Sequence, residues 1–159
     1  YVSSMKTILT PVDFSSSTPA VVAQAALLAR SFNGRVVLLS VIQPPVITSE
    51  YAPLMENIAE ITAAGEKAAA KQLSRLQDEL QRESIPSESV QLNGAPVPHI
   101  IEQAKKCQAD YIVMGSHGHT ALYELLVGST THGVLMRATC PVVITPATQE
   151  KPNPRDAKP

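Results

Sequence analysis

Hydrophobic residues along this chain fall into short continuous runs, separated by longer stretches in which they recur every three or four positions. Met5–Val12 is predicted to be a strand and Tyr111–Met114 a short buried strand, and the continuous apolar run Arg35–Ile42 is expected of a strand that is buried on both faces. Two more short runs, Ser89–Leu92 and Pro141–Pro146, bring the number of predicted strands to five. Helical spacing between the runs predicts crossover helices.

The helical stretches have recognisable starts and ends. Four helices are predicted, from Pro19 to the Asn33-Gly34 pair, from Ile58 to Leu80, from Pro96 to Cys107 and from Ser129 to Ala138. Ser15–Thr18 before Pro19 is a helix-start signature with a capping hydroxyl, and glycine is the preferred left-handed C-cap. The strand–helix alternation predicts an α/β fold, a single Rossmann-like three-layer domain whose five-stranded parallel sheet has helices on both faces.

The expected domain spans residues 5–146. Met5 is a candidate native start, and residues 1–4 are interpreted as an artificial extension. Residues 43–53 contain three prolines and are expected to form a loop. The polar, proline-bearing residues 147–159 predict a disordered tail.

Composition and charge narrow the possible function classes. The 159 residues are 44% hydrophobic and 17% charged, which is ordinary for a globular protein. A formal net charge of −1 gives no electrostatic basis for a nucleic-acid or membrane partner, and no apolar run reaches the roughly 20 residues of a membrane helix. The two cysteines, Cys107 and Cys140, occur in no motif, and we expect buried free thiols in a reducing cytoplasm.

The most informative motif lies between the fourth strand and the last helix. Met114-Gly115-Ser116-His117-Gly118 is followed by nine residues and then by Gly128-Ser129-Thr130-Thr131. Glycines and small hydroxyl residues at this place let the backbone approach a phosphate chain, whose charge is received by unpaired N–H groups. A glycine-rich loop that only turns the chain is the alternative, but paired turns between a strand and a helix favour nucleotide binding.

Asp13 directly follows the first strand, and Val41 lies near the end of the second. In a parallel sheet of this kind, ligands bind beyond the carboxyl ends of the strands, where the strand order reverses. Asp13 is therefore a candidate acceptor for an adenine amino group or a ribose hydroxyl, although a cap on the following helix is an equally good interpretation. Val41 is either a rim residue against base or sugar, or a core valine.

Catalytic and metal-binding motifs are missing from the sequence. His117, His119 and His132 lack the companion ligands of a structural zinc site, so the sequence predicts no metal-binding residue. It also has no Walker lysine, no Gly-x-Ser-x-Gly elbow and no carboxylate pair near the glycine loop, which predicts no catalytic residue. No Lys or Arg lies between Gly115 and Thr131, so phosphate charge would be balanced by backbone dipoles and a solution cation.

These motifs resemble the universal stress protein family from Met5 to Pro146. The resemblance rests on Pro11-Val12-Asp13-Phe14-Ser15, on the two glycine turns with their nine-residue gap, and on the ending Ala138–Ile144. The Gly-x-x-Gly, nine residues, Gly-Ser/Thr pattern is typical of the ATP-binding branch of this family. The resemblance implies a sheet of strand order 3-2-1-4-5 and ATP or AMP as ligand, with Mg²⁺ as a candidate companion.

The resemblance also implies roles for individual residues. Asp13 and Val41 would contact adenine and ribose, and Pro11 and Val12 belong to the same part of the expected site. Met114 and Gly115 would line the nucleotide. The residues expected to hold the phosphates are His117, Gly118, Gly128, Ser129, Thr130 and Thr131. His119 departs from the family, where Arg or Lys is common, and Thr130 replaces a common Val.

Taken together, the residues and the resemblance predict a cytoplasmic adenine-nucleotide-binding regulatory protein of the stress response. The alternatives are a slow ATPase or nucleotide hydrolase of the same superfamily, and an interaction module without nucleotide. The strand order would leave the last strand at a sheet edge, where the unpaired N–H and C=O groups of Val142, Val143 and Ile144 favour pairing with a second copy. We therefore expect a homodimer.

Overall fold

The computed structural model describes residues 4–45, 55–117 and 127–146; the predictions for Gly118, His119 and the tail after residue 146 lie outside these ranges. The strands are β1 (Thr7–Pro11), β2 (Arg35–Ile42), β3 (Ser87–Asn93), β4 (Tyr111–Gly115) and β5 (Val142–Thr145). The helices are α1 (Thr18–Ser31), α2 (Met55–Arg82), α3 (Pro96–Lys106) and α4 (Ser129–Leu135). The order of elements is the one that the hydrophobic pattern predicted.

The five strands form one parallel sheet of order β3-β2-β1-β4-β5, which confirms the predicted topology. β1 is central, and its Leu9 pairs with Val37 of β2 on one side and with Ile112 of β4 on the other. All three residues are fully buried. Strands buried on both faces need continuous apolar runs, which explains the sequence pattern.

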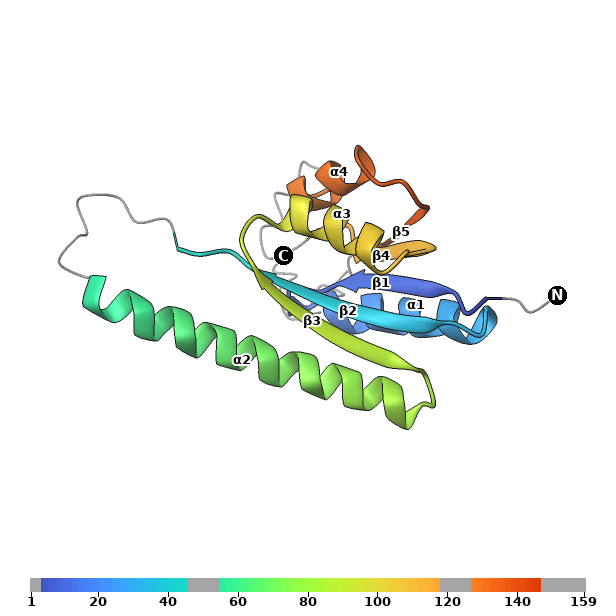
Figure 1. Ribbon diagram of the computed structural model, residues 1–159, viewed down its shortest axis with the longest axis horizontal. Coiled ribbons are helices and arrows are strands. Elements are labelled where there is room, and N and C mark those ends of the chain that lie inside the picture. The colour runs from blue at the N-terminus through green and yellow to red at the C-terminus, as the bar shows by residue number, and fades with distance from the viewer. Residues whose placement is uncertain (1–3, 46–54, 118–126, 147–159) are drawn as a thin grey trace, which may run out of the picture.

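The helices cover the two faces of the sheet and make three layers (Figure 1). Successive strand residues point to opposite faces, so Ile8 packs with α1 and α2 while its neighbour Leu9 packs with α3 and α4. Val36 and Leu38 join Ile8 on the first face, and they alternate with residues that face the second. The core is therefore divided by the sheet into two apolar clusters.

Several predicted boundaries are wrong by one to three residues, among them the starts of β1, at Thr7 rather than Met5, and of α2, at Met55 rather than Ile58. β3 begins at Ser87 rather than Ser89, because the backbone of Ser87 and Glu88 pairs with β2 although the side chains are polar. α4 ends at Leu135 rather than Ala138. The last predicted turn of α4 is largely exposed, with Met136 at 73%, so little packing holds it in a helix.

The end of α1 differs from the predicted glycine cap. Asn33, with φ +49°, takes the left-handed conformation, and Phe32 is the C-cap. Gly34 is needed for a different reason, since a Cβ on it would lie 2.6 Å from the carbonyl oxygen of Lys6. The close approach joins this turn to the residue that precedes β1.

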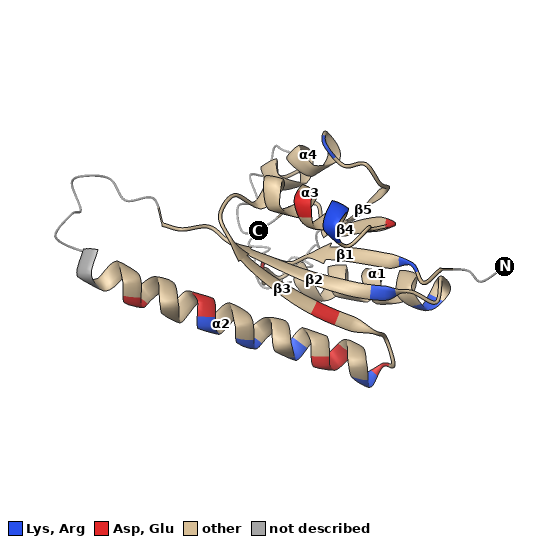
Figure 2. Cartoon of the chain, in the orientation of Figure 1, with Lys and Arg blue, Asp and Glu red and all other residues tan. Residues whose placement is uncertain are grey.

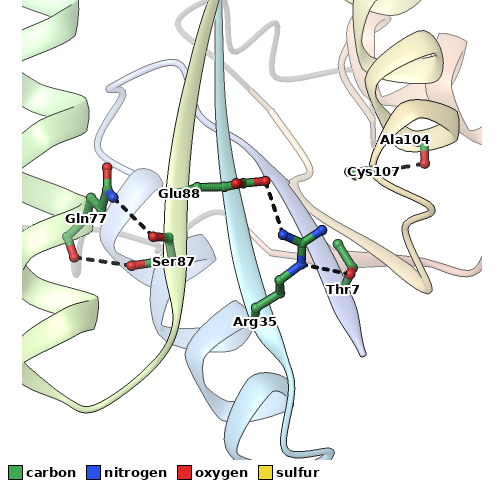
Figure 3. Close-up of polar contacts among 7 residues, drawn as sticks. All are labelled: Thr7, Arg35, Gln77, Ser87, Glu88, Ala104 and Cys107. Carbon is green, nitrogen blue, oxygen red and sulfur yellow. Dashed lines mark hydrogen bonds and ion pairs between the residues drawn. The ribbon is translucent and has the colours of Figure 1, made fainter. Parts of the chain in front are cut away.

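The two cysteines are free thiols, as expected, but both are partly rather than fully buried. Cys107 follows α3 and lies 3.8 Å from the carbonyl oxygen of Ala104 through its sulfur (Figure 3). Partial burial raises the pKa of both the Cys107 and the Cys140 thiols above the usual value. Within the described residues, no helix combines the length and apolar character needed to cross a membrane.

Candidate functional site

The site lies beyond the carboxyl ends of β1 and β4, which are neighbours in the sheet. The chain continues from β1 into α1, which packs on one face of the sheet. The next helix after β4 is α4, which packs on the other face. Connections that depart to opposite faces from adjacent strands leave a crevice between them. The ends of β1 and β4 therefore form the topological switch point of this sheet.

A cavity of about 290 Å³ occupies this crevice, close to the lower end of the range for small-molecule pockets. It is lined from six elements and the turns that follow them. Its lining residues are Pro11, Val12, Asp13, Ser17, Thr18, Val21, Leu39, Val41, Gln43, Pro96, Ile100, Met114, Gly115, His117, Gly128, Ser129, Thr130 and Thr131. Apolar strand residues alternate here with hydroxyl and backbone groups.

The sequence-predicted site residues come together in this one cavity. The eleven that the structure describes all line it: Pro11, Val12, Asp13, Val41, Met114, Gly115, His117, Gly128, Ser129, Thr130 and Thr131. Gly118, the twelfth, lies outside the described residues. Residues that are more than 100 positions apart in the chain thus share one surface.

The turn between β1 and α1 presents Asp13 at the cavity. One Asp13 carboxylate oxygen accepts a hydrogen bond from the Ser15 amide at 3.0 Å, and Phe14 between them has φ +59°. A phenylalanine in the left-handed region is unusual and reflects a tight turn. Because the N-cap of α1 is Ser17, Asp13 caps the turn rather than the helix itself.

Ser17 has a role that the sequence did not suggest. It is buried, and its hydroxyl makes no capping bond to α1, contrary to the expected helix-start signature. Instead the hydroxyl lies 2.9 Å from Ser15 Oγ and donates a long hydrogen bond, 3.5 Å, to the carbonyl oxygen of His117. This contact joins the turn after β1 to the turn after β4.

The other wall of the cavity is held by short hydrogen bonds around α4. Thr131 Oγ1 donates to the Gly115 carbonyl oxygen at 2.8 Å, and the Gly128 amide donates to the Ser116 carbonyl oxygen at 2.7 Å. Gly128 is the N-cap of α4 and is extended, with φ −66° and ψ 160°. These bonds fix the start of α4 against the end of β4.

Gly115 at the end of β4 leaves little room for a side chain. A Cβ there would lie 3.2 Å from Ser17 Oγ, 3.4 Å from the His117 carbonyl oxygen and 3.5 Å from a methyl group of Val21. The glycine thus lets β4, the following turn and α1 approach one another closely. His117 itself is half-buried, and its Nδ1 lies 3.1 Å from Ser116 Oγ.

Seven lining residues were not predicted: Ser17, Thr18, Val21, Leu39, Gln43, Pro96 and Ile100. Part of this set has a signal in the sequence, because Pro96 and Ile100 are four residues apart and share one side of α3. Leu39 is fully buried, so the sequence pattern marks it as a core residue and does not indicate that it also lines the cavity. Gln43 directly follows β2, at the same sheet edge as Asp13.

The cavity carries little charge. Asp13 is the lone carboxylate among the described lining residues, which include no Lys or Arg. No group of three or more potential metal ligands occurs in residues 4–45, 55–117 and 127–146, and the exposed His132 does not line the cavity. The chemistry on offer is therefore hydrogen bonding from hydroxyls and backbone, together with apolar contact.

Known proteins place this chain in a family. The family model described as the universal stress protein family matches residues 5–146. The universal stress protein A homolog 1 of Coxiella burnetii is 34% identical over 142 residues, which cover 87% of this chain and 94% of that protein. The chain belongs to the universal stress protein family.

Solved structures agree on the fold. Protein MJ0577 of Methanocaldococcus jannaschii superposes with a TM-score of 0.76 at 27% identity, covering 89% of this chain and 96% of that one. The universal stress protein UspA of Lactobacillus plantarum gives a TM-score of 0.78 at 25% identity, covering 87% and 96%. The present chain is thus similar to both over almost their whole length.

Proposed function

We propose that this protein is a cytoplasmic regulatory protein of the stress response that binds an adenine nucleotide, ATP or AMP, in the cavity at the ends of β1 and β4. The observation that carries the proposal is the convergence of Asp13, Val41 and the two glycine turns on that cavity. The free thiols of Cys107 and Cys140 suit a reducing compartment.

The chemistry of the lining suits a nucleotide. Met114 and Val41 offer apolar surface for a base, and the Asp13 carboxylate is an acceptor for an amino group or a ribose hydroxyl. Gly128, Ser129 and Thr130 offer small side chains and backbone donors for phosphate oxygens. Since the described lining lacks a cationic side chain, a triphosphate would enter with Mg²⁺ bound to it.

Two other members of the family have been solved with nucleotides. Solved structures of universal stress proteins hold cAMP, at 23% identity to this chain, and dAMP, at 21% identity. At such identities the likeness extends to the fold alone. The proposal therefore depends on this chain's own cavity and motif.

Titration with a fluorescent ATP analogue in the presence of Mg²⁺ tests the proposal, with AMP as competitor. We expect saturable binding that falls at least about tenfold, or 1.4 kcal/mol, in Gly128→Val. The extended backbone of Gly128 suits valine, so the variant should fold, and its side chain would enter the phosphate region. Gly65→Val on α2, where a Cβ meets nothing within 4 Å, is the matched control. Absent saturation, or unchanged binding in folded Gly128→Val, rejects the assignment.

We further propose a homodimer that pairs β5 with its own copy. β5 is an edge strand, and Val142, Val143 and Ile144 are only partly buried in the single chain. The Pro141 and Thr145 carbonyls accept bonds from Ile112 and Ser116, so the alternate residues 142 and 144 present their backbone outward. Unpaired edge groups of this kind favour strand addition.

Light scattering on Val142→Pro tests that interface. Proline removes an outward N–H without touching the bonds to β4, whereas proline at position 143 would damage the sheet itself. Val142→Ala controls for the lost packing. We expect a dimer in the wild type and in Val142→Ala, and a monomer in Val142→Pro; a monomeric wild type contradicts the proposal.

A further inference from the structure

Helix α2 is much longer than the strand beside it. Its 28 residues span about 42 Å, whereas the seven residues of β3 span about 23 Å. Figure 1 shows the amino-terminal half of α2 running past the end of β3. Among the side chains described in that half, residues 57–68, none is buried, and the first buried residue of α2 is Ala69. The amino-terminal half of α2 therefore has an exposed surface that does not pack on the sheet.

An apolar strip lies on that surface. Ile61 is 67% exposed, and Ala64 and Ala68 are exposed at three and seven residues further on. This spacing places the three on one side of the helix, away from the stripe of Ala69 and Leu73 that packs on the sheet. We call Ile61, Ala64 and Ala68 the Ile61 face. Two alanines beside one isoleucine form a shallow depression next to a projecting side chain.

Charges of both signs border the Ile61 face along one flank. Glu60 comes first, and Lys67 and Lys71 follow at seven and eleven residues, which places all three on the same side of the helix. Figure 2 shows acidic and basic segments in succession along α2. In a parallel pair about a two-fold axis, the two flanks would lie on opposite sides of the contact, so Glu60 of one copy would not meet the lysines of the other. An antiparallel one would set each Glu60 beside lysines.

We propose that the Ile61 face binds the same face of a second copy of this chain, with the two α2 helices antiparallel about a two-fold axis. Ile61 of each copy then packs over Ala68 of the other, and the axis passes near Ala64. Glu60 of each copy lies beside Lys67 and Lys71 of the other, so opposite charges meet on the flank. Packing and charge thus select the same arrangement.

The contact is expected to be weak and reversible. One exposed isoleucine, a few alanines and solvent-exposed ion pairs place it at the small end of specific interfaces. It uses α2 and leaves both the nucleotide cavity and the β5 edge free. A chain with two separate two-fold contacts, at α2 and at β5, can build assemblies larger than a dimer.

Sedimentation velocity over a series of protein concentrations tests the surface. We expect the weight-average mass of the wild type to rise with concentration beyond that of the β5 dimer, and this further rise to disappear in Ile61→Glu. Leu27→Glu is the matched control, since Leu27 is 53% exposed on α1, and it should behave as the wild type. A mass that is independent of concentration, or an equal rise in Ile61→Glu, overturns the proposal.

A mixing experiment tests the orientation. The flank becomes wholly basic in Glu60→Lys and wholly acidic in the double variant Lys67→Glu, Lys71→Glu, and all three residues are exposed. Each variant alone should lose the rise in mass, and their equimolar mixture should recover it at low salt and lose it again above about 0.5 M salt. A mixture that behaves like its separate components overturns the antiparallel pairing.

Discussion

The two ends of the sheet are built from different chemistry. Where the strands begin, charged side chains cross-link neighbouring strands: Lys6 pairs with Asp110 at 2.9 Å, and Arg35 pairs with Glu88 at 3.4 Å (Figure 3). Where the strands end, Asp13 is the one charged side chain among the described lining residues, and the turns are held by backbone and hydroxyl bonds. The charged cross-links between strands thus lie at the end of the sheet opposite the candidate nucleotide cavity.

The links at the beginning of the strands form a chain across the sheet. Asp110 also accepts a bond from the Thr7 amide at 2.9 Å, and Arg35 Nε donates to Thr7 Oγ1 at 3.1 Å while its guanidinium pairs with Glu88 (Figure 3). β1, β2, β3 and the turn before β4 are joined in this way. The comparison suggests that one end of the sheet contributes stability and the other is left open for a ligand.

The largest expected effect comes from Gly34→Ala at the strand beginnings. The added Cβ would lie 2.6 Å from the carbonyl oxygen of Lys6, a backbone atom that cannot move alone, so we expect a loss of about 2 kcal/mol in the free energy of unfolding. Urea denaturation measures the loss. Nucleotide affinity of the folded variant should be unchanged, and a selective loss of affinity would break the division between the two ends.

Thr131→Val tests the carboxyl ends of the strands, where we expect a somewhat smaller loss in the free energy of unfolding. Thr131 is 4% exposed and its hydroxyl bonds to the Gly115 carbonyl oxygen, so its removal leaves a buried acceptor unsatisfied at a cost of about 1–2 kcal/mol. Because the bond also fixes the start of α4, affinity for nucleotide should fall together with stability. Thr131→Ser keeps the hydroxyl and should keep most of both; full affinity in folded Thr131→Val would contradict the positioning role.

Asp110→Asn tests the ionic end of the sheet through pH. The Thr7 amide and the Lys6 ammonium hold the pKa of the Asp110 carboxyl below its usual value of 3.8. A group whose pKa is lowered by folding stabilises the protein above its unfolded pKa, and this contribution is lost as pH falls through the folded value. At pH 7 we expect the variant to lose about 1 kcal/mol, and the difference from wild type to shrink as the pH falls below the usual pKa of a carboxyl group. A difference that stays the same in acid would exclude the carboxylate as its cause.

The smallest expected effect is the rate of ATP hydrolysis. The described lining offers no Lys or Arg clamp and no carboxylate beside Asp13, so ATP turnover should be absent or far below the 1–10³ s⁻¹ that is typical of enzymes. Single-turnover release of phosphate measures it, with Gly128→Val to identify contamination. Release at ordinary enzyme rates that disappears in this variant would favour the alternative of a nucleotide hydrolase.

Most of the fold was predictable from sequence because the parallel sheet needs apolar runs that are easy to see. Arg35–Ile42, buried over most of its length, is an example, and its predicted bounds agree with β2. β3 was predicted short because its pairing with β2 depends on the backbone, which polar residues such as Ser87 provide equally well. The left-handed residue after α1 was expected to be Gly34 rather than Asn33, because asparagine and glycine both adopt that conformation.

Candidate site residues were predictable where glycines and hydroxyls stand at the end of a strand or the start of a helix, as at Gly115 and Gly128. It was not predictable where a residue serves two purposes. Ser17 has the sequence position of a helix cap, yet its hydroxyl reaches His117, 100 residues away in the chain. Ile100 has the spacing of a core residue and also lines the cavity. Contacts of this kind depend on the folded arrangement of distant segments.

Nucleotide binding in the cavity at the ends of β1 and β4 is tested most directly by an amide NMR titration of the whole chain with Mg²⁺ and ATP, repeated with AMP. The account predicts saturable shifts at Gly115, His117, Ser129 and Thr130, and none at Thr7, Arg35 or Asp110, at the opposite end of the same strands. Shifts confined to the beginnings of the strands, or no saturable shift at either end, would contradict nucleotide binding in this cavity.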